Sequence, residues 1–484
     1  MTRVEELERR APSQAAAAGG MHELLAIALP MVISHACDTV MMFTDRLYLS
    51  KLGPEQMNAS MAGGLTCYML MTFFLGLTGY STALVAQYLG AGRKDRCATA
   101  TTQAMLIALT AYPLILLARP LVHVVFARTG ISAGQLAPQI EYFDIVIYAA
   151  VVGLLRNCLS SFFSGIGRTR IVMVSAATAM LVNVGMNYIL IYGKLGSPAL
   201  GVRGAAYGTV IGGVFGLGVL LTAYLSGQTR QTFRVWHSLR FDRDAMAKLL
   251  RFGYPAGVEM FLNLMAFNAM IVAFHAHSPA TATAVTVMFN WDMVSFVPLV
   301  GIQIGVMSLV GRYMGAGQPD IAHRAAMSGL KCGSLYSLII LILFVGFPKD
   351  LVAVFRPEQV DAIFREAAPI AVRMIRIASI YVMLEAALVV FSGTLRGAGD
   401  TVWAMCVSVV LHWLMLGILI VILYVLRLSP EVAWTGVVLS FLSFSFVFYG
   451  RYRGGKWRTI RMVRTQAELL ATDHDHDFHE PRDL

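Results

Sequence analysis

Long apolar runs dominate the chain, and short polar or basic stretches separate them. A run of roughly 20 apolar residues predicts a helix that crosses the hydrocarbon core, because backbone polar groups in lipid must be hydrogen-bonded within their own segment. Twelve runs meet this condition, near residues 22–49, 60–82, 98–118, 143–164, 170–193, 204–226, 249–273, 282–306, 327–347, 367–392, 402–426 and 432–450. The pattern predicts an all-α membrane protein with twelve transmembrane helices.

The two halves of the chain resemble each other. Leu84 to Asp95 (LVAQYLGAGRKD) matches Leu309 to Asp320 (LVGRYMGAGQPD) at seven of twelve positions, with an offset of 225 in the numbering. The same offset relates Pro30 to Pro255, and an offset of 232 relates the motifs GIGRT and GAGDT. Six helices per repeat return the chain to its starting side, so we expect a parallel internal repeat. Both prolines lie within predicted helices, where the lost backbone hydrogen bond permits a bend.

Composition supports the membrane assignment and excludes several classes of protein. Hydrophobic residues make up 57% of the chain and charged residues 14%, whereas roughly a quarter of the residues of a soluble domain are charged. The net charge of +10 comes from residues between apolar runs, which is typical of cytoplasmic loops and does not indicate nucleic-acid binding. No phosphate-binding loop, HExxH or GxSxG motif is present, so we expect neither an enzyme nor direct use of ATP. No cofactor is expected.

The repeat and the polar stretches divide the chain into five parts. These are an N-terminal segment (1–21), an N-lobe (22–227), a linker (228–248), a C-lobe (249–452) and a C-terminal tail (453–484). Basic residues gather in the terminal segments and the linker, so we expect both termini in the cytoplasm. The linker mixes basic and aromatic residues, which suits either a segment lying on an anionic membrane face or a solvated connector. The tail segment DHDHDFHE could bind metal weakly or be a disordered polar end.

Ionisable and amide residues inside the first-half helices are the first candidate site. A carboxylate at the bilayer centre costs about 2.5 to 3.5 kcal/mol, so an acid kept there usually faces a cavity or a partner. Asp38 and Asp45 lie on nearly one face of the first helix, together with His35. Asn183 and Asn187 form an i,i+4 pair whose oxygens could orient a carboxylate or ligate a hard cation. We expect Asp45 to couple transport to an ion, and Asp38 and His35 to tune the pH of coupling.

The second half supplies a different set of acids. Glu259 and Asn263 are one turn apart in the seventh helix, Asp292 lies in the eighth, and Glu385 lies in the tenth. None of these acids has an acidic counterpart in the first repeat, so the halves should share a scaffold and differ in chemistry. For every acid, the alternative is a structural hydrogen bond or a position near the membrane surface, where a carboxylate costs little.

Several motifs together resemble the multidrug and toxic compound extrusion (MATE) family of transporters. They are TDRLYLSKLGP around Asp45, QYLGAGR and RYMGAGQ, GIGRT followed by NVGMNYILIYG, LGVRGAAYGT, and SGTLRGAGDT. The resemblance extends from Leu24 to about Arg453. It implies two six-helix lobes arranged as a V around a central cavity. It also implies that Asp45, Asn183 and Asn187 form an N-lobe proton or cation site, and Asn187 is typical of the NorM-like branch.

The resemblance implies a second ion site in the C-lobe. Tyr381 and Glu385 match a pair in which the branch usually carries Asp, and Glu385 is a candidate ligand for Na⁺. The acid of the seventh helix in the family would fall at Asn263, whereas this chain has Glu259 one turn earlier. No firm metal site is implied beyond this cation.

The function implied by the residues and by the resemblance is secondary transport. We expect an antiporter that exports amphipathic organic substrates, mainly cations, in exchange for inward H⁺ or Na⁺. It should act as a monomer in the lipid bilayer of the bacterial inner membrane. The alternative is a flippase for a lipid-linked saccharide, whose cavity would be rich in Arg and Lys. The intramembrane charges of this chain are mainly acidic, which favours a cationic substrate. A membrane enzyme or receptor is the remaining class, and no motif supports it.

Overall fold

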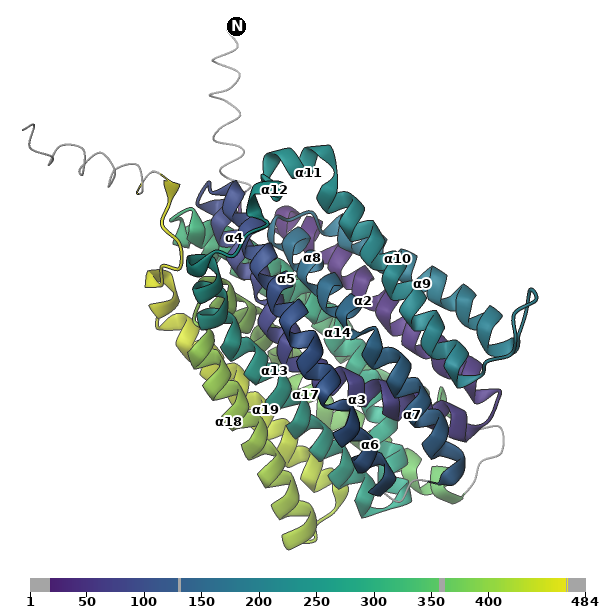
Figure 1. The fold of residues 1–484 in the computed structure, drawn as a ribbon. Coiled ribbons are helices and arrows are strands. Elements are labelled where there is room, and N and C mark those ends of the chain that lie inside the picture. Colours follow the sequence, from purple (N-terminus) through teal and green to yellow (C-terminus); the bar gives the residue numbers. More distant parts are fainter. Residues whose placement is uncertain (1–17, 129–131, 357–361, 467, 469–484) are drawn as a thin grey trace, which may run out of the picture. The chain divides into compact units, whose positions relative to one another are not determined.

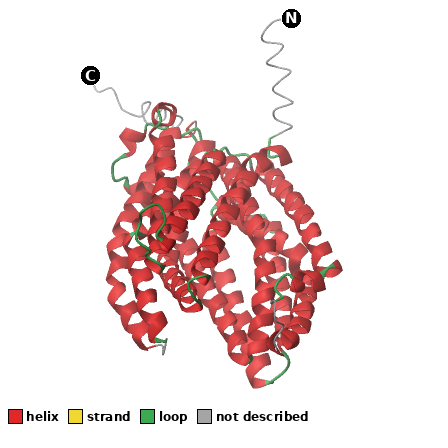
Figure 2. Cartoon of the chain, turned by 90° about the vertical axis from the view of Figure 1, so that its right-hand side faces the viewer, coloured by secondary structure: helices red, strands yellow, loops and turns green. Residues whose placement is uncertain are grey.

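The computed structural model describes residues 18–128, 132–356, 362–466 and 468. Helices are the regular elements of this part of the chain, and it contains no strand (Figures 1 and 2). In chain order they are α2 (Met21–Ser50), α3 (Pro54–Gly79), α4 (Ser81–Gly90), α5 (Lys94–Leu117), α6 (Arg119–Arg128), α7 (Ala133–Tyr148), α8 (Ala150–Gly165), α9 (Thr169–Tyr192), α10 (Val202–Leu225), α11 (Gly227–Thr232), α12 (Val235–Ser238), α13 (Arg243–His277), α14 (Pro279–Gly315), α15 (Pro319–Gly346), α16 (Pro348–Ala353), α17 (Ala362–Ala398), α18 (Thr401–Ile420), η1 (Val421–Val425), α19 (Pro430–Arg453) and η2 (Lys456–Thr459).

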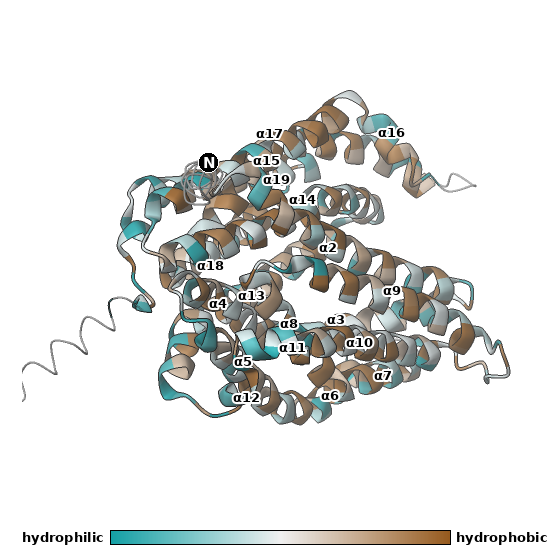
Figure 3. Ribbon diagram, turned by 90° about the horizontal axis from the view of Figure 1, so that it is seen from above, coloured by the Kyte–Doolittle hydropathy of each residue, from teal (hydrophilic) through white to brown (hydrophobic). Residues whose placement is uncertain are grey.

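The helices reproduce the predicted membrane spans. Among the described residues, eleven helical stretches are long and apolar enough to cross a membrane. The remaining predicted span, near residues 143–164, corresponds to α7 and α8, which meet at a bend of 47°. Figure 3 shows hydrophobic residues covering much of the long helices, whereas α11 between two spans is hydrophilic. The prediction of an all-α membrane protein with twelve spans is confirmed.

Helix ends differ from the ends of the apolar runs. The seventh span was predicted to start at residue 249, but α13 begins at Arg243. The cause is Asp242, whose carboxylate accepts a hydrogen bond of 2.9 Å from the backbone N–H of Ala245. A side-chain acceptor at this position stabilises the first turn of a helix, so the helix extends into the polar linker.

The internal repeat is visible in the backbone. Gly92 and Gly317, which the offset of 225 relates, both adopt positive φ angles of 80° and 69°. In each turn the N–H of the next residue bonds to the carbonyl five residues earlier, at 2.9 and 2.8 Å. This bond and the left-handed glycine together define a helix-ending motif. Gly167 and Gly399 form the same turn at the offset of 232, with φ angles of 76° and 101°.

One contact between helices also recurs in both halves. The hydroxyl of Tyr192 donates to the carbonyl of Tyr48 at 2.8 Å, and that of Tyr424 donates to the carbonyl of Ala273 at 2.6 Å. The larger offset of the repeat relates the two donor tyrosines, and the smaller offset relates their two acceptors. The first and fifth spans of each repeat are therefore joined in the same way.

The described chain forms two compact units. One contains residues 18–32, 258–307, 323–356 and 362–460, and the other contains residues 33–128, 132–257, 308–322, 461–466 and 468. Each unit holds most of one repeat, while α2, α13, α14 and α15 contribute residues to both. The predicted lobe boundaries follow the repeat and stay a prediction.

Candidate ion-coupling sites

Asp45 of α2 lies among neutral hydrogen-bond donors from two other helices. Asn187 of α9 donates through Nδ2 to Oδ1 of Asp45, and Thr209 of α10 donates through its hydroxyl to Oδ2 at 3.3 Å. Asn183 completes the cluster, because its amide donates to Thr209 at 3.3 Å and accepts from Asn187 at 3.2 Å. Both asparagines are fully buried. No ion pair to Asp45 is formed within the described part of the chain.

Glycines of α10 allow this cluster to form. A Cβ atom added at Gly208 would collide with Oδ1 of Asn187, and one added at Gly212 would lie 2.9 Å from Cβ of Asn183. A larger residue at either position would push α9 away from α10. The prediction from sequence missed Thr209, although a polar residue next to Gly208 in an otherwise apolar span was the available indication.

One atom of the cluster has no hydrogen-bond partner. Oδ1 of Asn187 is buried and unpaired among the described protein groups. A buried acceptor left unpaired costs about 1 to 3 kcal/mol. A protonated carboxyl group at Asp45 could donate to such an acceptor, and a hard cation such as Na⁺ could be ligated by it. The donor set therefore fits either ion.

Asp38 has a different partner. The guanidinium of Arg156 in α8 donates to Oδ1 of Asp38 at 2.9 Å. The two side chains are 39% and 21% exposed for Asp38 and Arg156, respectively. Because Asp38 lies about 10 Å before Asp45 along the helix axis, each acid contacts its own set of residues. Arg156 thus places a positive charge beside the predicted face of acids on α2. It lies inside a predicted span but was not among the candidate residues.

His35 does not bond to either acid. Its Nε2 atom is buried without a hydrogen-bond partner among the described groups, and Asp38 lies one turn away on the same helix. The structure brings His35 near Asp38 but not into the cluster around Asp45.

Asp292 and Glu385 lie at the contact between α14 and α17. The hydroxyl of Tyr381 donates to Oδ1 of Asp292, and that of Ser295 donates to Oε2 of Glu385 at 3.0 Å. On α14, Asp292 and Ser295 are three residues apart. On α17, Tyr381 and Glu385 are four residues apart. The two hydrogen bonds between these helices therefore lie about one helical turn apart. Tyr381 and Glu385, which the resemblance implied as a pair, each bond to α14 and not to each other. Ser295 was not predicted.

Glu259 is neutralised by a basic residue. The guanidinium of Arg396 in α17 donates to Oε1 of Glu259 at 2.7 Å, and the carboxylate is only 4% exposed. Asn263 bonds elsewhere, because its amide donates to the hydroxyl of Ser408 in α18 at 2.9 Å. The structure therefore separates these two residues into different contacts.

The predicted bends lie within continuous helices. Pro30 is inside α2 and Pro255 is inside α13, and both helices extend through the proline. Bending during transport stays a prediction. No group of three or more metal-ligating side chains is found among the described residues, and the segment DHDHDFHE lies outside them.

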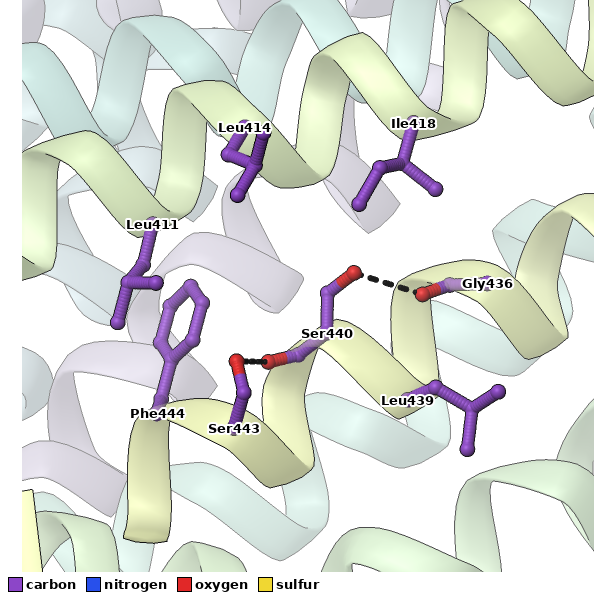
Figure 4. Close-up of a pocket in the computed structure, with 8 residues that line it drawn as sticks. All are labelled: Leu411, Leu414, Ile418, Gly436, Leu439, Ser440, Ser443 and Phe444. Carbon is purple, nitrogen blue, oxygen red and sulfur yellow. Dashed lines mark hydrogen bonds between the residues drawn. The ribbon is translucent and has the colours of Figure 1, made fainter. Parts of the chain in front are cut away.

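An open groove between α18 and α19 is not part of either cluster. It has a volume of about 380 Å³ and is shown in Figure 4. Its lining consists of Leu411, Leu414, Ile418, Gly436, Leu439, Ser440, Ser443 and Phe444. Both serine hydroxyls donate to carbonyls of their own helix, at 2.8 and 2.6 Å. The groove thus presents an apolar surface without an ionisable group.

Comparison with protein-family models gives one match that occurs twice. The family described as MatE matches residues 30–189 and 255–421, which together cover about two thirds of the chain. The starts of the two matched segments differ by the smaller offset of the internal repeat, and their ends differ by the larger one. The family match therefore follows the duplication.

Curated proteins similar to this chain include several transporters. The probable multidrug resistance protein NorM of Thermotoga maritima is 22% identical over 454 residues, covering 92% of this chain and 95% of the relative. The multidrug resistance protein PmpM of Pseudomonas aeruginosa is 26% identical over 437 residues, covering 87% and 88%.

Solved structures show the same fold. A transporter of the MOP superfamily from Pyrococcus furiosus superposes with a TM-score of 0.82 at 17% identity, covering 91% of this chain and 97% of that one. The outward-facing conformation of a multidrug resistance MATE family transporter gives a TM-score of 0.81 at 18% identity, covering 90% and 96%. The fold and the matches define a multi-span membrane transporter, and not an enzyme. The chain belongs to the MATE family, whose members are ion-coupled antiporters.

Proposed function

We propose that this chain is a secondary antiporter that exports amphipathic organic cations in exchange for inward H⁺ or Na⁺. The observation that carries the proposal is the environment of Asp45. Its carboxylate is held by an amide and a hydroxyl and forms no ion pair in the described chain. Such a group can gain and lose a positive ion during a transport cycle. Asp38 and Glu259 already have guanidinium partners, so they are poor candidates for that role.

The second acid pair supports coupling in the other unit. Asp292 and Glu385 also lack an ion pair in the described residues and accept only from hydroxyl groups. Two carboxyl groups about one turn apart repel each other when both are ionised, so binding of one positive ion is favoured there. Glu385 is the candidate Na⁺ ligand of this pair.

The charges favour a cationic substrate over a lipid-linked saccharide. A flippase for such a saccharide needs free basic groups to hold pyrophosphate, whereas Arg156 and Arg396 are each engaged by an acid. The names of the relatives refer to multidrug resistance. We place the protein in the bacterial inner membrane as a monomer with both termini in the cytoplasm, and we expect its substrates to be drug-like cations.

Transport by the purified full-length chain in proteoliposomes tests this proposal. H⁺ and Na⁺ gradients are imposed separately, and uptake of a fluorescent organic cation is followed in each case. We expect one gradient to drive uptake and its dissipation by an ionophore to abolish it. Uptake that ignores both gradients, or movement of a lipid-linked saccharide without any ion gradient, would contradict the proposal.

A further inference from the structure

The linker between α10 and α13 has one face docked on the protein. Phe233, Val235 and Ser238 are buried. The Phe233 ring packs edge to face on Phe162 at 5.2 Å between centroids, and the hydroxyls of Ser238 and Thr102 are 3.1 Å apart. The linker is therefore a fixed part of its unit.

Polar contacts hold the end of the linker against α5. Gln103 donates to the carbonyl of Arg240 at 3.0 Å, and Arg96 forms an ion pair of 2.5 Å with Asp242. Burial alone would raise the pKa of Asp242, but the N–H of Ala245 and the Arg96 guanidinium outweigh it and hold the pKa below its usual range. Asp242 is thus ionised at neutral pH, and the contact with Arg96 persists.

The opposite face of the linker carries exposed aromatic and apolar side chains. Trp236, Leu239 and Phe241 are 57%, 55% and 61% exposed. They alternate with exposed arginines at positions 230, 234, 240 and 243. None of these arginines forms an ion pair within the described residues. The outer face, defined here as Arg234, Trp236, Leu239, Arg240 and Phe241, thus combines apolar surface with positive charge that no carboxylate bonds.

The position of the linker brings this face to the membrane boundary. It connects α10 and α13, which are both candidate membrane spans, and α11 begins two residues after α10 ends. Figure 1 shows α11 and α12 at the end of α10. Tryptophan and phenylalanine side chains are stable at the level of lipid headgroups, and arginines nearby are attracted to anionic lipid phosphates.

We propose that the outer face of the linker binds the anionic phospholipid surface of the membrane. The aromatic side chains insert among the headgroups, while Arg234 and Arg240 bind lipid phosphates. A solvated connector would expose three large apolar side chains to water without compensation. The docked inner face keeps the arginines and aromatics in one fixed arrangement that suits a flat anionic surface.

Quenching of Trp236 by brominated lipids tests the proposal. The full chain is placed in phosphatidylcholine nanodiscs that contain increasing fractions of either brominated phosphatidylglycerol or brominated phosphatidylcholine. The chain has six tryptophans, so the contribution of Trp236 is obtained by subtracting the signal of Trp236→Phe. We expect this contribution to be quenched at a lower fraction of phosphatidylglycerol than of phosphatidylcholine.

Variants separate lipid binding from nonspecific effects. Arg234→Gln and Arg240→Gln should each raise the fraction of phosphatidylglycerol needed for half quenching by about fivefold. The matched control Arg356→Gln, an exposed arginine elsewhere in the chain, should leave it unchanged. Absence of quenching by either lipid would overturn the proposal and show a solvated connector. Equal quenching by both lipids, or unchanged half quenching in both linker variants, would overturn the binding of anionic headgroups.

Discussion

The acids in the spans fall into two kinds according to their partners. Asp38 and Glu259 are paired with arginines, whereas Asp45, Asp292 and Glu385 accept hydrogen bonds from neutral groups. The carboxylate of a paired acid already has a positive partner. An acid among neutral donors can exchange its charge with a bound ion, so the second kind is suited to coupling.

Neutralising either member of the Asp38–Arg156 pair should shift the pH optimum of efflux. Asp38→Asn leaves a positive charge near Asp45, which favours the ionised carboxylate and moves the optimum to lower pH. Arg156→Gln leaves a negative charge and should move it to higher pH. The double variant removes both charges and should return close to the wild-type optimum. The measurement is a pH profile of efflux in vesicles with two unrelated cationic substrates.

Shifts of both single variants in the same direction would contradict this account of the pair. A changed preference among substrates with an unmoved optimum would instead place Asp38 and Arg156 in the substrate pocket.

Glu385→Gln should affect transport differently under the two gradients. A carboxylate is a hard oxygen ligand suited to a dehydrated cation, whereas a proton needs only a titratable group. Under a proton gradient we expect a smaller loss of transport than for Asp45→Asn, and under a sodium gradient a larger loss.

Tyr381→Phe, which removes the hydrogen bond to Asp292, should change transport in the same direction as Glu385→Gln. Initial uptake rates in proteoliposomes measure the difference, with exposed Glu366→Gln on the same helix as the control. Identical behaviour of the two sites under both gradients would exclude this division of roles.

The residues of the first site were largely predictable, but their partners were not. Asn183 and Asn187 stand out because two amides at i,i+4 in an apolar helix need a common polar neighbour. Arg156 and Thr209 were not predicted as partners of Asp38 and Asp45, because the choice of partner depends on how neighbouring helices are rotated and shifted against each other. That register is set by packing across the helix pair, and a single sequence does not contain it explicitly.

At the scale of helices, the close contact of α9 and α10 positions the cluster around Asp45. It depends on the absence of side chains at Gly208 and Gly212. Sequence patterns predicted both helices, but glycines in membrane helices are common, so the pattern did not reveal which of them allow a close approach.

Gly208→Ala should disrupt coupling without altering any ionisable group. The added methyl group would collide with Oδ1 of Asn187 and displace the donor to Asp45. Overpacking of this kind typically costs about 1 to 3 kcal/mol, so a lower melting temperature should accompany the loss of ion-coupled uptake. Gly218→Ala on the same helix meets no atom within 4 Å and serves as the control. Wild-type coupling in Gly208→Ala, at equal protein abundance, would show that Asn187 is not required at its observed position.

At the scale of the whole molecule, the number of spans between two loops determines whether they lie on the same side of the membrane. The twelve spans and the parallel repeat followed from apolar run lengths and from the two offsets, because both leave a direct record in the sequence. The composition of the two compact units did not, since it depends on four helices that each contribute to both units.

The linker and the turn before α10 should lie on opposite sides of the membrane. In a variant without the native cysteines, Leu195→Cys lies at a position that is 89% exposed and should react with an impermeant maleimide in right-side-out vesicles. Arg240→Cys should react only in inverted vesicles, because the positive-inside rule places the linker in the cytoplasm. Labelling of both positions from one side would contradict the predicted topology.

The central claim is that reversible neutralisation of Asp45 couples ion entry to substrate export. Its most direct test is the movement of H⁺ or Na⁺ that an organic cation evokes in proteoliposomes, measured with an ion-sensitive dye for the wild type and Asp45→Asn. The account predicts substrate-evoked ion movement in the wild type and only the level of protein-free liposomes in the variant, with substrate binding and protein abundance retained. Equal ion movement in both proteins would contradict it.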